Sequence, residues 1–555
     1  MNAVEPAIWT TRTTEAIKTG TWRAMLPLHI RAPSPCHQAC PVGGEIAQWI
    51  TQARVGNTHG AWLTLALHNP FPAIAGRICH HPCETACNRA TYDAPLAICK
   101  LERTVGDIAL AQGWAFALPR KEHAARVAVV GGGPSGLSAA YQLRRLGLQV
   151  SLFELRPALG GLMRYGIPPY RLARDVLDGE IARIVAMGVQ VFTDHAITSQ
   201  DQLARLRTQH GAVYLAPGAQ RPHKLVQLPE QAPWLMDSAG YLAQANVGMP
   251  PALGRRIAVI GGGSAALDVA RSARRAGHEV TIIALEAAAR MPAQHEELVE
   301  AREEGITLMD STMLGTVQPQ PGGDLLLECQ PVHCEPGPIR GQFTVTALAL
   351  PPTSITVDAV IPAVGQAPNL DGWADGFVRA GALLQTDGRH QTSDRDVWAG
   401  GDVASMARFV TEAIGMGKHA AHDIARHLKP ASDTQTPALG DGAAAAQTVT
   451  LARIATTYHA AADRTPENRL VPAQRLASGA EVQLPLSIEQ ALAEAERCFS
   501  CGQCTHCDNC LQYCPDLAIV RSDGAYAVLS DYCKGCGVCV AECPTGSMLM
   551  QEELR

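Results

Sequence analysis

Short apolar runs alternate with glycine turns and helical stretches in the middle of the chain. Residues 126–130 read Arg-Val-Ala-Val-Val, the turn at 131–136 reads Gly-Gly-Gly-Pro-Ser-Gly, and a helical pattern leads on to Gly147. A second apolar run at 149–153 ends at Glu154. We therefore predict strand, turn, helix, strand and acid in this order, which is the frame of a dinucleotide-binding unit.

The glycine turn gives this frame its chemistry. Glycines let the backbone approach a pyrophosphate that lies at the N-terminus of the following helix. An acid 18 residues past the last glycine suits the hydroxyls of an adenosine ribose. The candidate residues for this first site are Gly131, Gly133, Pro134, Ser135, Gly136 and Glu154.

The same frame returns after the apolar run at 256–260. Alanine at the third glycine position is an accepted variant. One such turn alone can be a turn that binds nothing, but two in strand–helix frames predict a flavoprotein with FAD in the first site and a nicotinamide dinucleotide in the second. The candidates for the second site are Gly261, Gly263, Ser264, Ala265, Ala266 and Glu286.

A third motif completes the predicted flavin domain. A short strand at 396–399 runs into Gly400-Gly401-Asp402, so that the Asp402 carboxylate can meet ribityl and ribose hydroxyls. The helix expected at 411–421 points its N-terminus toward the flavin. Residues 215–218 and 363–369 are predicted to be the two crossings between the flavin and nicotinamide domains.

The last sixty residues hold ten of the chain's 18 cysteines. Two runs follow the C-x2-C-x2-C-x3-C-P spacing of a bacterial ferredoxin with two 4Fe-4S clusters, in which the fourth cysteine of each run binds the other cluster. Zinc knuckles and disulfides are the alternatives, but zinc rarely uses this tight spacing twice. One predicted set is Cys504, Cys507, Cys510 and Cys543, and the other is Cys533, Cys536, Cys539 and Cys514.

The N-terminal part of the chain, up to position 123, carries a second cysteine group, and six cysteines so close together in a cytosolic chain predict metal. Its members are Cys36, Cys40, Cys79, Cys83, Cys87 and Cys99. The spacing of Cys79, Cys83 and Cys87 places them on adjacent turns if that segment is helical. His37, His80 and His81 are expected to support the site rather than bind metal, and Cys329 and Cys334, in a predicted strand and turn, to be structural.

Composition narrows the class of protein. A chain of 555 residues has room for three to four domains, and a net charge of −6 gives no sign of nucleic-acid binding. No run of 18 uncharged apolar residues predicts a membrane span, and the first residues lack the pattern of a signal peptide. We therefore expect a cytoplasmic protein whose cysteines serve metal or redox chemistry.

The predicted fold is a multidomain α/β chain. It combines a helical iron–sulfur domain, a glutathione-reductase-like double dinucleotide-binding core and a bacterial-type ferredoxin domain. The expected boundaries are 1–123 for the helical domain, 124–238 and 359–429 for the two parts of the FAD domain, 239–358 for the NAD(H) domain, 430–486 for a linker and fold-back segment, and 487–555 for the ferredoxin.

In this order, the motifs resemble the glutamate synthase small-subunit family of iron–sulfur flavoproteins, and dihydropyrimidine dehydrogenase carries a similar half. The resemblance covers residues from about 30 to 425. It implies that the segment from Gly160 to Pro168, with Gly161 and Leu162, lies beside the flavin. With its fusion to a two-cluster ferredoxin, the chain resembles electron-transfer subunits of multi-subunit enzymes, such as the flavin subunit of phenylglyoxylate dehydrogenase-type 2-oxoacid oxidoreductases.

The chain departs from the family at the second dinucleotide site. The family has a basic segment there that holds the 2′-phosphate of NADPH, whereas this chain has Ala284-Leu285-Glu286. A carboxylate repels a phosphate and accepts the hydroxyls of a free ribose, so we expect NAD(H) rather than NADP(H), although Arg290 is close enough in sequence to contribute a positive charge.

A second departure concerns a pair of cysteines that the family places before its N-terminal cluster segment. Residues 1–35 contain none, yet Glu494-Ala-Glu-Arg-Cys498-Phe-Ser-Cys501-Gly502 has the family's form just upstream of the ferredoxin. We therefore expect the C-terminal segment to fold back, so that four 4Fe-4S clusters form; the alternative is that these two thiols bind nothing. The resemblance implies one cluster on Cys36, Cys87, Cys498 and Cys501, and another on Cys40, Cys79, Cys83 and either Glu102 or Cys99.

The expected function is electron transfer between NADH and a partner oxidoreductase, such as a 2-oxoacid:acceptor oxidoreductase, with no catalytic acid or base. The substrate-converting site would lie on another subunit of a complex. A glutamate synthase small subunit and the flavoprotein partner of a sulfur-oxidising sulfite reductase are the alternative enzymes. A redox sensor or scaffold is the alternative of another class, which two intact dinucleotide frames disfavour.

Overall fold

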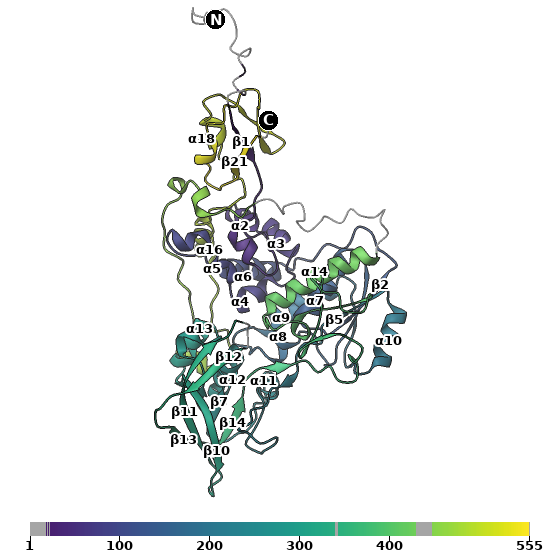
Figure 1. Cartoon of the computed structure of the whole chain (residues 1–555), viewed down its shortest axis with the longest axis vertical. Coiled ribbons are helices and arrows are strands. Elements are labelled where there is room, and N and C mark those ends of the chain that lie inside the picture. Colours follow the sequence, from purple (N-terminus) through teal and green to yellow (C-terminus); the bar gives the residue numbers. More distant parts are fainter. Residues whose placement is uncertain (1–17, 19, 21–22, 339–341, 429–446, 554–555) are drawn as a thin grey trace, which may run out of the picture.

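The computed structural model describes residues 18, 20, 23–338, 342–428 and 447–553. Along its longest axis, Figure 1 shows the cysteine-rich C-terminal unit at one end, a cluster of short helices next to it, and two dinucleotide-binding domains beyond them. Residues 430–446 of the expected linker and fold-back segment (430–486) lie outside the described residues.

The first dinucleotide-binding domain is built on a parallel sheet with the strand order β18-β5-β2-β3-β4. Its central strands are apolar and buried, because helices cover both faces of the sheet. The strands are β2 (Arg126–Val130), β3 (Gln149–Phe153), β4 (Gln190–Phe192), β5 (Ala212–Leu215) and β18 (Val397–Ala399). The helices are α7 (Pro134–Arg145), α8 (Leu162–Tyr165), α9 (Arg174–Val185), α10 (Gln200–Gln209) and α14 (Val410–Leu428).

The second dinucleotide-binding domain repeats this plan with the parallel order β14-β7-β8-β9 and adds an antiparallel sheet of β10 to β13. Strand β6 (Arg221–Pro222) pairs with β15 (Gln366–Ala367) where the chain crosses between the domains, next to both predicted crossings. The parallel strands are β7 (Arg256–Ile260), β8 (Glu279–Ile283), β9 (Thr307–Met309) and β14 (Ala359–Pro362). The helices are α11 (Ser238–Ala245), α12 (Ser264–Arg275) and α13 (His295–Glu303), and the antiparallel strands are β10 (Thr312–Pro319), β11 (Leu325–Pro336), β12 (Phe343–Ala347) and β13 (Thr353–Val357). Cys329 and Cys334 both lie in β11, so the expected turn at Cys334 is wrong, and Cys329 is fully buried.

Short helices form the N-terminal domain around two fully buried tryptophans, Trp49 and Trp62. The helices are α1 (Pro35–Ala39), α2 (Ile46–Arg54), α3 (Thr58–Ala66), α4 (Pro72–Ile78), α5 (Pro82–Thr85) and α6 (Ile98–Ala111). Cys79, Cys83 and Cys87 do not share one helix. The chain leaves α4 at Cys79, and Pro82 starts a new helix because proline disfavours helical backbone in the residue before it.

Both ends of the chain meet in the C-terminal unit. Strand β1 (Met25–His29) pairs antiparallel with β21 (Met548–Glu552), and Gly20 donates its N–H to the Asp531 carbonyl at 2.9 Å. Residues 25–29 therefore lie with the ferredoxin, although the boundary expected at 123 groups them with the helical domain. The rest of the unit comprises α17 (Asn509–Gln512), β19 (Ile519–Ser522), β20 (Ala525–Val528) and α18 (Val538–Ala541).

Residues 447–486, which we call the strap, cross the helical domain and reach the second dinucleotide-binding domain. The strap contains α15 (Pro472–Ala477) and otherwise little regular structure, and polar contacts hold it. Glu481 forms ion pairs with Arg77 and Arg103, both at 2.7 Å, and Arg475 pairs with Glu303 of α13 at 2.8 Å. The N–H of Val482 also donates to the Tyr170 carbonyl of the first dinucleotide-binding domain, so the fold-back segment expected from the sequence is packed against the helical domain and both dinucleotide-binding domains. None of the helices within the described residues is long and apolar enough to cross a membrane.

Candidate redox site

The first glycine turn forms an open cradle between β2 and α7. Gly131 has a φ of +104°, and a side chain there would overlap the carbonyl oxygen of Ala216. Gly161 has a φ of +51°, and its Cβ would lie 2.8 Å from the Cα of Gly133. The two loops therefore approach each other closely only because both residues lack a side chain. Pro134 and Ser135 start α7, whose backbone N–H groups face this cradle, as a pyrophosphate site requires.

The acid of the first frame lies at the end of β3, beside this turn. The Glu154 carboxylate is 7% exposed and accepts N–H groups from Gly132 at 2.7 Å and Arg156 at 2.8 Å. These bonds fix its position next to the glycine turn, where it can meet ribose hydroxyls. Gly136 packs against the Gly131 carbonyl, and Leu162, at the start of α8, is half-exposed.

The third motif lies at the carboxyl end of β18, on the same edge of the sheet. A Cβ at Gly401 would lie 3.0 Å from the Ser135 Cβ, so this turn touches the first residues of α7. Burial raises the pKa of the Asp402 carboxyl, and the charge of Arg408 opposes that rise. The structure thus brings Gly401 and Asp402 to the glycine cradle predicted to hold FAD.

We expect Gly161→Ala to lose most of its flavin. The methyl group would push the two loops of the cradle apart, and the positive φ at this position disfavours any side chain. The flavin content of the purified variant, measured from absorbance against protein, should fall several-fold. Gly218→Ala is the matched control, since Gly218 also has a positive φ but nothing within 4 Å of its Cβ position. Equal flavin content in the two variants would contradict this role of Gly161.

The second glycine turn repeats this geometry between β7 and α12. A Cβ at Gly262 would lie 2.6 Å from the Glu286 carboxylate, so the acid lies over the turn as Glu154 does in the first frame. Gly261 has a φ of +136°, and nothing lies within 4 Å of the Cβ position at Gly263. Ser264 and the exposed Ala265 open α12, and the buried Ala266 packs under them. Arg290 ends a one-turn helix, Ala288–Arg290, that follows Glu286 in the chain.

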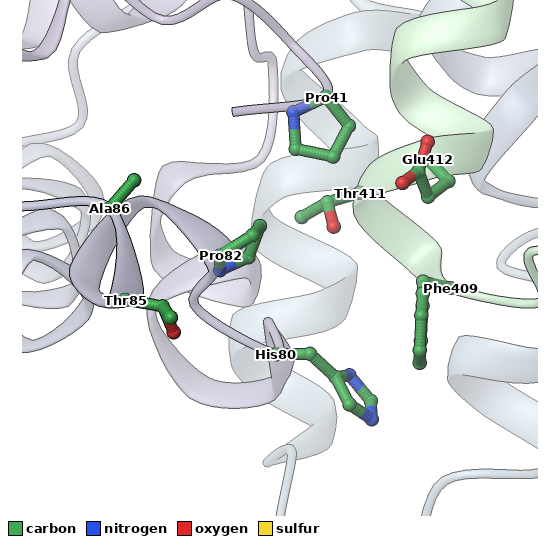
Figure 2. Close-up of a pocket in the computed structure, with 8 residues that line it drawn as sticks. All are labelled: Pro41, His80, Pro82, Thr85, Ala86, Phe409, Thr411 and Glu412. Carbon is green, nitrogen blue, oxygen red and sulfur yellow. The ribbon is translucent and has the colours of Figure 1, made fainter. Parts of the chain in front are cut away.

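Helix α14 brings the flavin domain into contact with the helical domain. The Cys79 sulfur lies 3.7 Å from the Thr411 hydroxyl, in the first turn of α14. A pocket of about 420 Å³ opens beside this contact, and Figure 2 shows His80 and Pro82 facing Phe409 and Thr411 across it. The pocket therefore lies where a predicted cluster ligand meets the helix that points toward the predicted flavin.

One group of candidate ligands lies next to this contact. After burial, the largest cause, the charges of Glu102 and the Cys40 thiol raise the pKa of Cys79. Burial, followed by the charges of neighbours that include Cys40 and Glu102, also raises the pKa of Cys83. Glu102 accepts a hydrogen bond from Asn69 at 2.9 Å, whereas the Cys99 thiol lies 3.5 Å from the Ala75 carbonyl.

A second group joins the two ends of the chain. Besides burial, which has the largest effect, the charges of Cys498, Cys501 and Cys87 raise the pKa of the Cys36 thiol. Burial and the charge of Cys498 likewise raise the pKa of Cys501 to about 12. The structure therefore gathers the four thiols of Cys36, Cys87, Cys498 and Cys501, as the fold-back expectation requires.

Protein contacts hold this arrangement in place. Helix α16 (Ile488–Glu496) starts with a capping box at Ser487 and contains the fully buried Glu494 in its last turn. Glu494 accepts N–H groups from Ala97 and Thr465, both at 2.8 Å, and pairs with Arg497 at 2.6 Å. Gly502 has a φ of +72°, and a side chain there would overlap the Ala32 carbonyl. Cys498 and Cys501 are thus positioned by contacts that do not involve a cluster.

The ferredoxin cysteines lie in the two crossed groups that their spacing predicts. Burial is the largest cause of the raised pKa of Cys504, Cys510, Cys533 and Cys539. The charge of Cys543 raises the pKa of Cys504 and Cys510 further, and the charge of Cys514 does the same for Cys533 and Cys539. Cys507 and Cys536 complete the groups and are the two exposed cysteines. All eighteen cysteines are free thiols, and within the described ranges no three His, Cys, Asp or Glu side chains are arranged to hold a single metal ion. The four thiolates of a four-iron cluster bind four different irons and need not converge on one point.

The first strand and the strap contribute contacts that sequence patterns did not predict. Strand β1 is short, and its partner β21 lies at the opposite end of the chain, so no local sequence pattern predicts the pairing. The strap is polar, and its ion pairs join residues far apart in sequence. The charged residues of this segment, such as Arg469, Arg475 and Glu481, were the feature from which ion pairs could have been predicted.

Three parts of the chain match known families. Residues 125–417 match pyridine nucleotide-disulphide oxidoreductases, residues 30–114 match the 4Fe-4S domain II of dihydropyrimidine dehydrogenase, and residues 503–548 match a 4Fe-4S dicluster domain. The chain is thus a flavin- and iron–sulfur-dependent oxidoreductase with an electron-transfer role, as its motifs predict. Since the first match spans more than half of its length, the chain belongs to the pyridine nucleotide-disulphide oxidoreductase family.

Several curated relatives align with most of this chain. The chain is 32% identical to the NADP(+)-dependent formate dehydrogenase subunit beta of Moorella thermoacetica, over 73% of this chain and 61% of that protein. It is 30% identical to a homolog of the NAD-dependent dihydropyrimidine dehydrogenase subunit PreT in Salmonella typhi, over 72% and 92%. It is 28% identical to the NADPH-Fe(3+) oxidoreductase subunit beta of Geobacter sulfurreducens, over 84% and 75%.

These relatives support the predicted class of enzyme, and their names do not agree on the nucleotide. Two of the three names specify NADP(+) or NADPH, and one specifies NAD. All three names describe a subunit, which agrees with the expected multi-subunit complex. FAD and NAD(P)H are the cofactors that the matched oxidoreductase family implies.

Proposed function

We propose that this chain oxidises NADH and passes the electrons, through FAD and four 4Fe-4S clusters, to a partner protein that docks at the ferredoxin domain. A bound flavin accepts two electrons as a hydride and releases them singly, so it connects the nicotinamide to one-electron carriers. The protein's part is to hold these groups in order and to exclude water between them. No side chain acts as acid or base in this scheme.

The observation that carries this proposal is the order of the four cysteine groups. Cys36 lies in α1 and Cys40 caps its C-terminal end, about one helical turn or 6 Å further on; Cys40 belongs to the first group and Cys36 to the second. Cys501 and Cys504 are three residues apart, a span of at most about 11 Å, and belong to the second and third groups. Cys510 and Cys514 join the third and fourth groups in the same way. The groups therefore form a continuous row from α14 to the ferredoxin.

The ligand sets follow from the contacts described above. Cys40, Cys79, Cys83 and Glu102 would hold the cluster nearest α14, since after burial the charge of Glu102 raises the pKa of all three thiols, whereas the Cys99 thiol contacts the Ala75 carbonyl. The row then continues through Cys36, Cys87, Cys498 and Cys501 to the ferredoxin sets. The exposed Cys507 and Cys536 mark the surface at which electrons leave for the partner.

Reduction of a viologen dye tests the activity, and an iron assay tests the number of clusters. The purified full-length protein should reduce the dye faster with NADH than with NADPH and should contain about sixteen irons. A protein that binds flavin but reduces the dye with neither nucleotide would favour a scaffold instead. Proteins that copurify with the chain would identify the partner.

We expect Glu286 to set the preference for NADH. In Glu286→Arg with Ala284→Ser, a positive charge replaces the carboxylate over the second glycine turn, where the ribose would lie. The ratio of kcat/KM for NADPH to that for NADH should rise about tenfold, which corresponds to about 1.4 kcal/mol. Glu279→Arg, an exposed change at the start of β8, the strand that leads to Glu286, serves as the control. If the ratio is unchanged, the ribose is recognised elsewhere.

A further inference from the structure

Helix α14 has one narrow face that contacts the first cysteine group, which consists of Cys40, Cys79, Cys83 and Glu102. Thr411, Gly415 and Lys418 are spaced i, i+4 and i+7 and therefore lie on the same side of the helix. Thr411 meets the Cys79 sulfur, and a side chain at Gly415 would overlap the Pro41 carbonyl. The missing side chain at Gly415 lets the helix approach the residues just after Cys40.

Lys418 is the charged member of this face, and it is 2% exposed. Its ammonium group donates to the Val42 carbonyl at 2.7 Å and contacts the Nδ1 of His68 at 2.8 Å. Both partners are neutral acceptors. In the described parts of the chain, Lys418 forms no ion pair with a carboxylate, and the nearby Glu45 is already paired with Arg31.

The imidazoles around Lys418 add no compensating negative charge. Burial, followed by the charge of Lys418, lowers the pKa of His68 to about 2, that of His422 to about 3 and that of His419 to about 4, so these imidazoles are neutral. Burial lowers the pKa of Lys418 itself to about 8, which leaves it charged at neutral pH. A buried charge without an opposite charge is costly, so the site is suited to an anion nearby.

Val42, whose carbonyl accepts the Lys418 hydrogen bond, lies two residues past Cys40. Of the negative groups that act on Lys418, the Cys40 sulfur has a larger effect than Glu45, and both favour the charged form of the lysine. We propose that Lys418 is a positioning residue that raises the reduction potential of the cluster held by Cys40, Cys79, Cys83 and Glu102. This inference rests on the proposed function. Reduction by one electron, supplied by the reduced flavin, adds one negative charge to the cluster, and the buried ammonium stabilises the reduced form more than the oxidised form.

The charge of Lys418 therefore favours the first electron transfer of the row, from the flavin to this cluster. The cluster beside α14 becomes a better electron acceptor than it would be without the lysine, at the point where electrons enter the row. Because Lys418 and Thr411 belong to the same helix, the flavin domain itself supplies the charge. Net charge and hydrogen bonds near the sulfurs are known determinants of such potentials.

A redox titration followed by electron paramagnetic resonance tests this role in the full-length protein. In Lys418→Met, the equilibrium for reduction of the cluster next to α14 should shift about tenfold toward the oxidised form, which is about 59 mV for one electron. Lys418→Arg, which keeps the charge, should recover most of this shift. Lys224→Met removes an exposed lysine and should change no potential.

Three outcomes separate the proposals. An unchanged potential in Lys418→Met, with all irons present, would overturn this inference and leave the proposed function standing. An equal shift of every cluster would also overturn it, because the effect would then be global. Wild-type protein without a cluster on Cys40 would overturn the proposed function and this inference together. If Lys418→Met does not fold, Lys418→Gln, which keeps a hydrogen-bond donor to Val42 without the charge, decides by the same titration.

Discussion

Replacing Cys498 and Cys501 together by alanine is expected to remove about four of some sixteen irons and to stop electrons from reaching the ferredoxin. The two thiols supply half of the second cysteine group, and a cluster with two protein ligands does not persist. Dye reduction by NADH through the flavin should continue. Reduction of the ferredoxin clusters by NADH, followed by electron paramagnetic resonance, should slow by at least about a hundredfold, since the row then has a gap.

The chain offers a matched control for this experiment. Cys329→Ala with Cys334→Ala also removes two thiols, but both lie in β11 and far from the cysteine groups. This variant should keep all its irons and its electron transfer. A double variant of Cys498 and Cys501 with full iron content would show that the C-terminal segment does not supply cluster ligands.

The second large effect is expected from Glu481→Leu in the strap. Glu481 is largely buried between Arg77 and Arg103 and also accepts the N–H of Ala173 at 2.9 Å. Removing one member of a buried ion pair leaves uncompensated charge and costs about 3–5 kcal/mol. Because the chain has several domains, we expect local opening of the strap rather than a shift of one global transition.

Hydrogen exchange measures this opening directly. Val482 donates its N–H to the Tyr170 carbonyl at 2.9 Å, and this amide should lose protection in Glu481→Leu. Arg469→Ala breaks an ion pair with Glu303 that is about one-third exposed and should cost no more than about 1 kcal/mol. Equal protection in both variants would mean that the strap is held by other contacts.

Local patterns explain how much could be predicted from the sequence. The glycine turns and their acids are set by residues within about 30 positions, so both dinucleotide frames and the motif at Asp402 were placed correctly on strands and helices. The ferredoxin groups follow from spacing alone. The family resemblance supplied an expectation that local patterns cannot give, namely that Cys498 and Cys501 share a cluster with Cys36 and Cys87 near the other end of the chain.

Other features depend on contacts between distant segments. Strand β1 gains its partner only when both chain ends meet, and Pro82 breaks the helix that spacing alone suggested for Cys79, Cys83 and Cys87. Lys418 lies in an ordinary amphipathic helix, and no pattern distinguishes it from a surface lysine. Its burial follows from the small residues of α14, which let the helical domain approach.

An anomalous difference map at the iron absorption edge, recorded from crystals of the full-length protein, tests the central claim most directly. We predict four clusters in a row, with one of them bounded by Cys36, Cys87, Cys498 and Cys501. A map with iron in the ferredoxin and beside Cys79 but none between Cys36 and Cys501 would contradict the account.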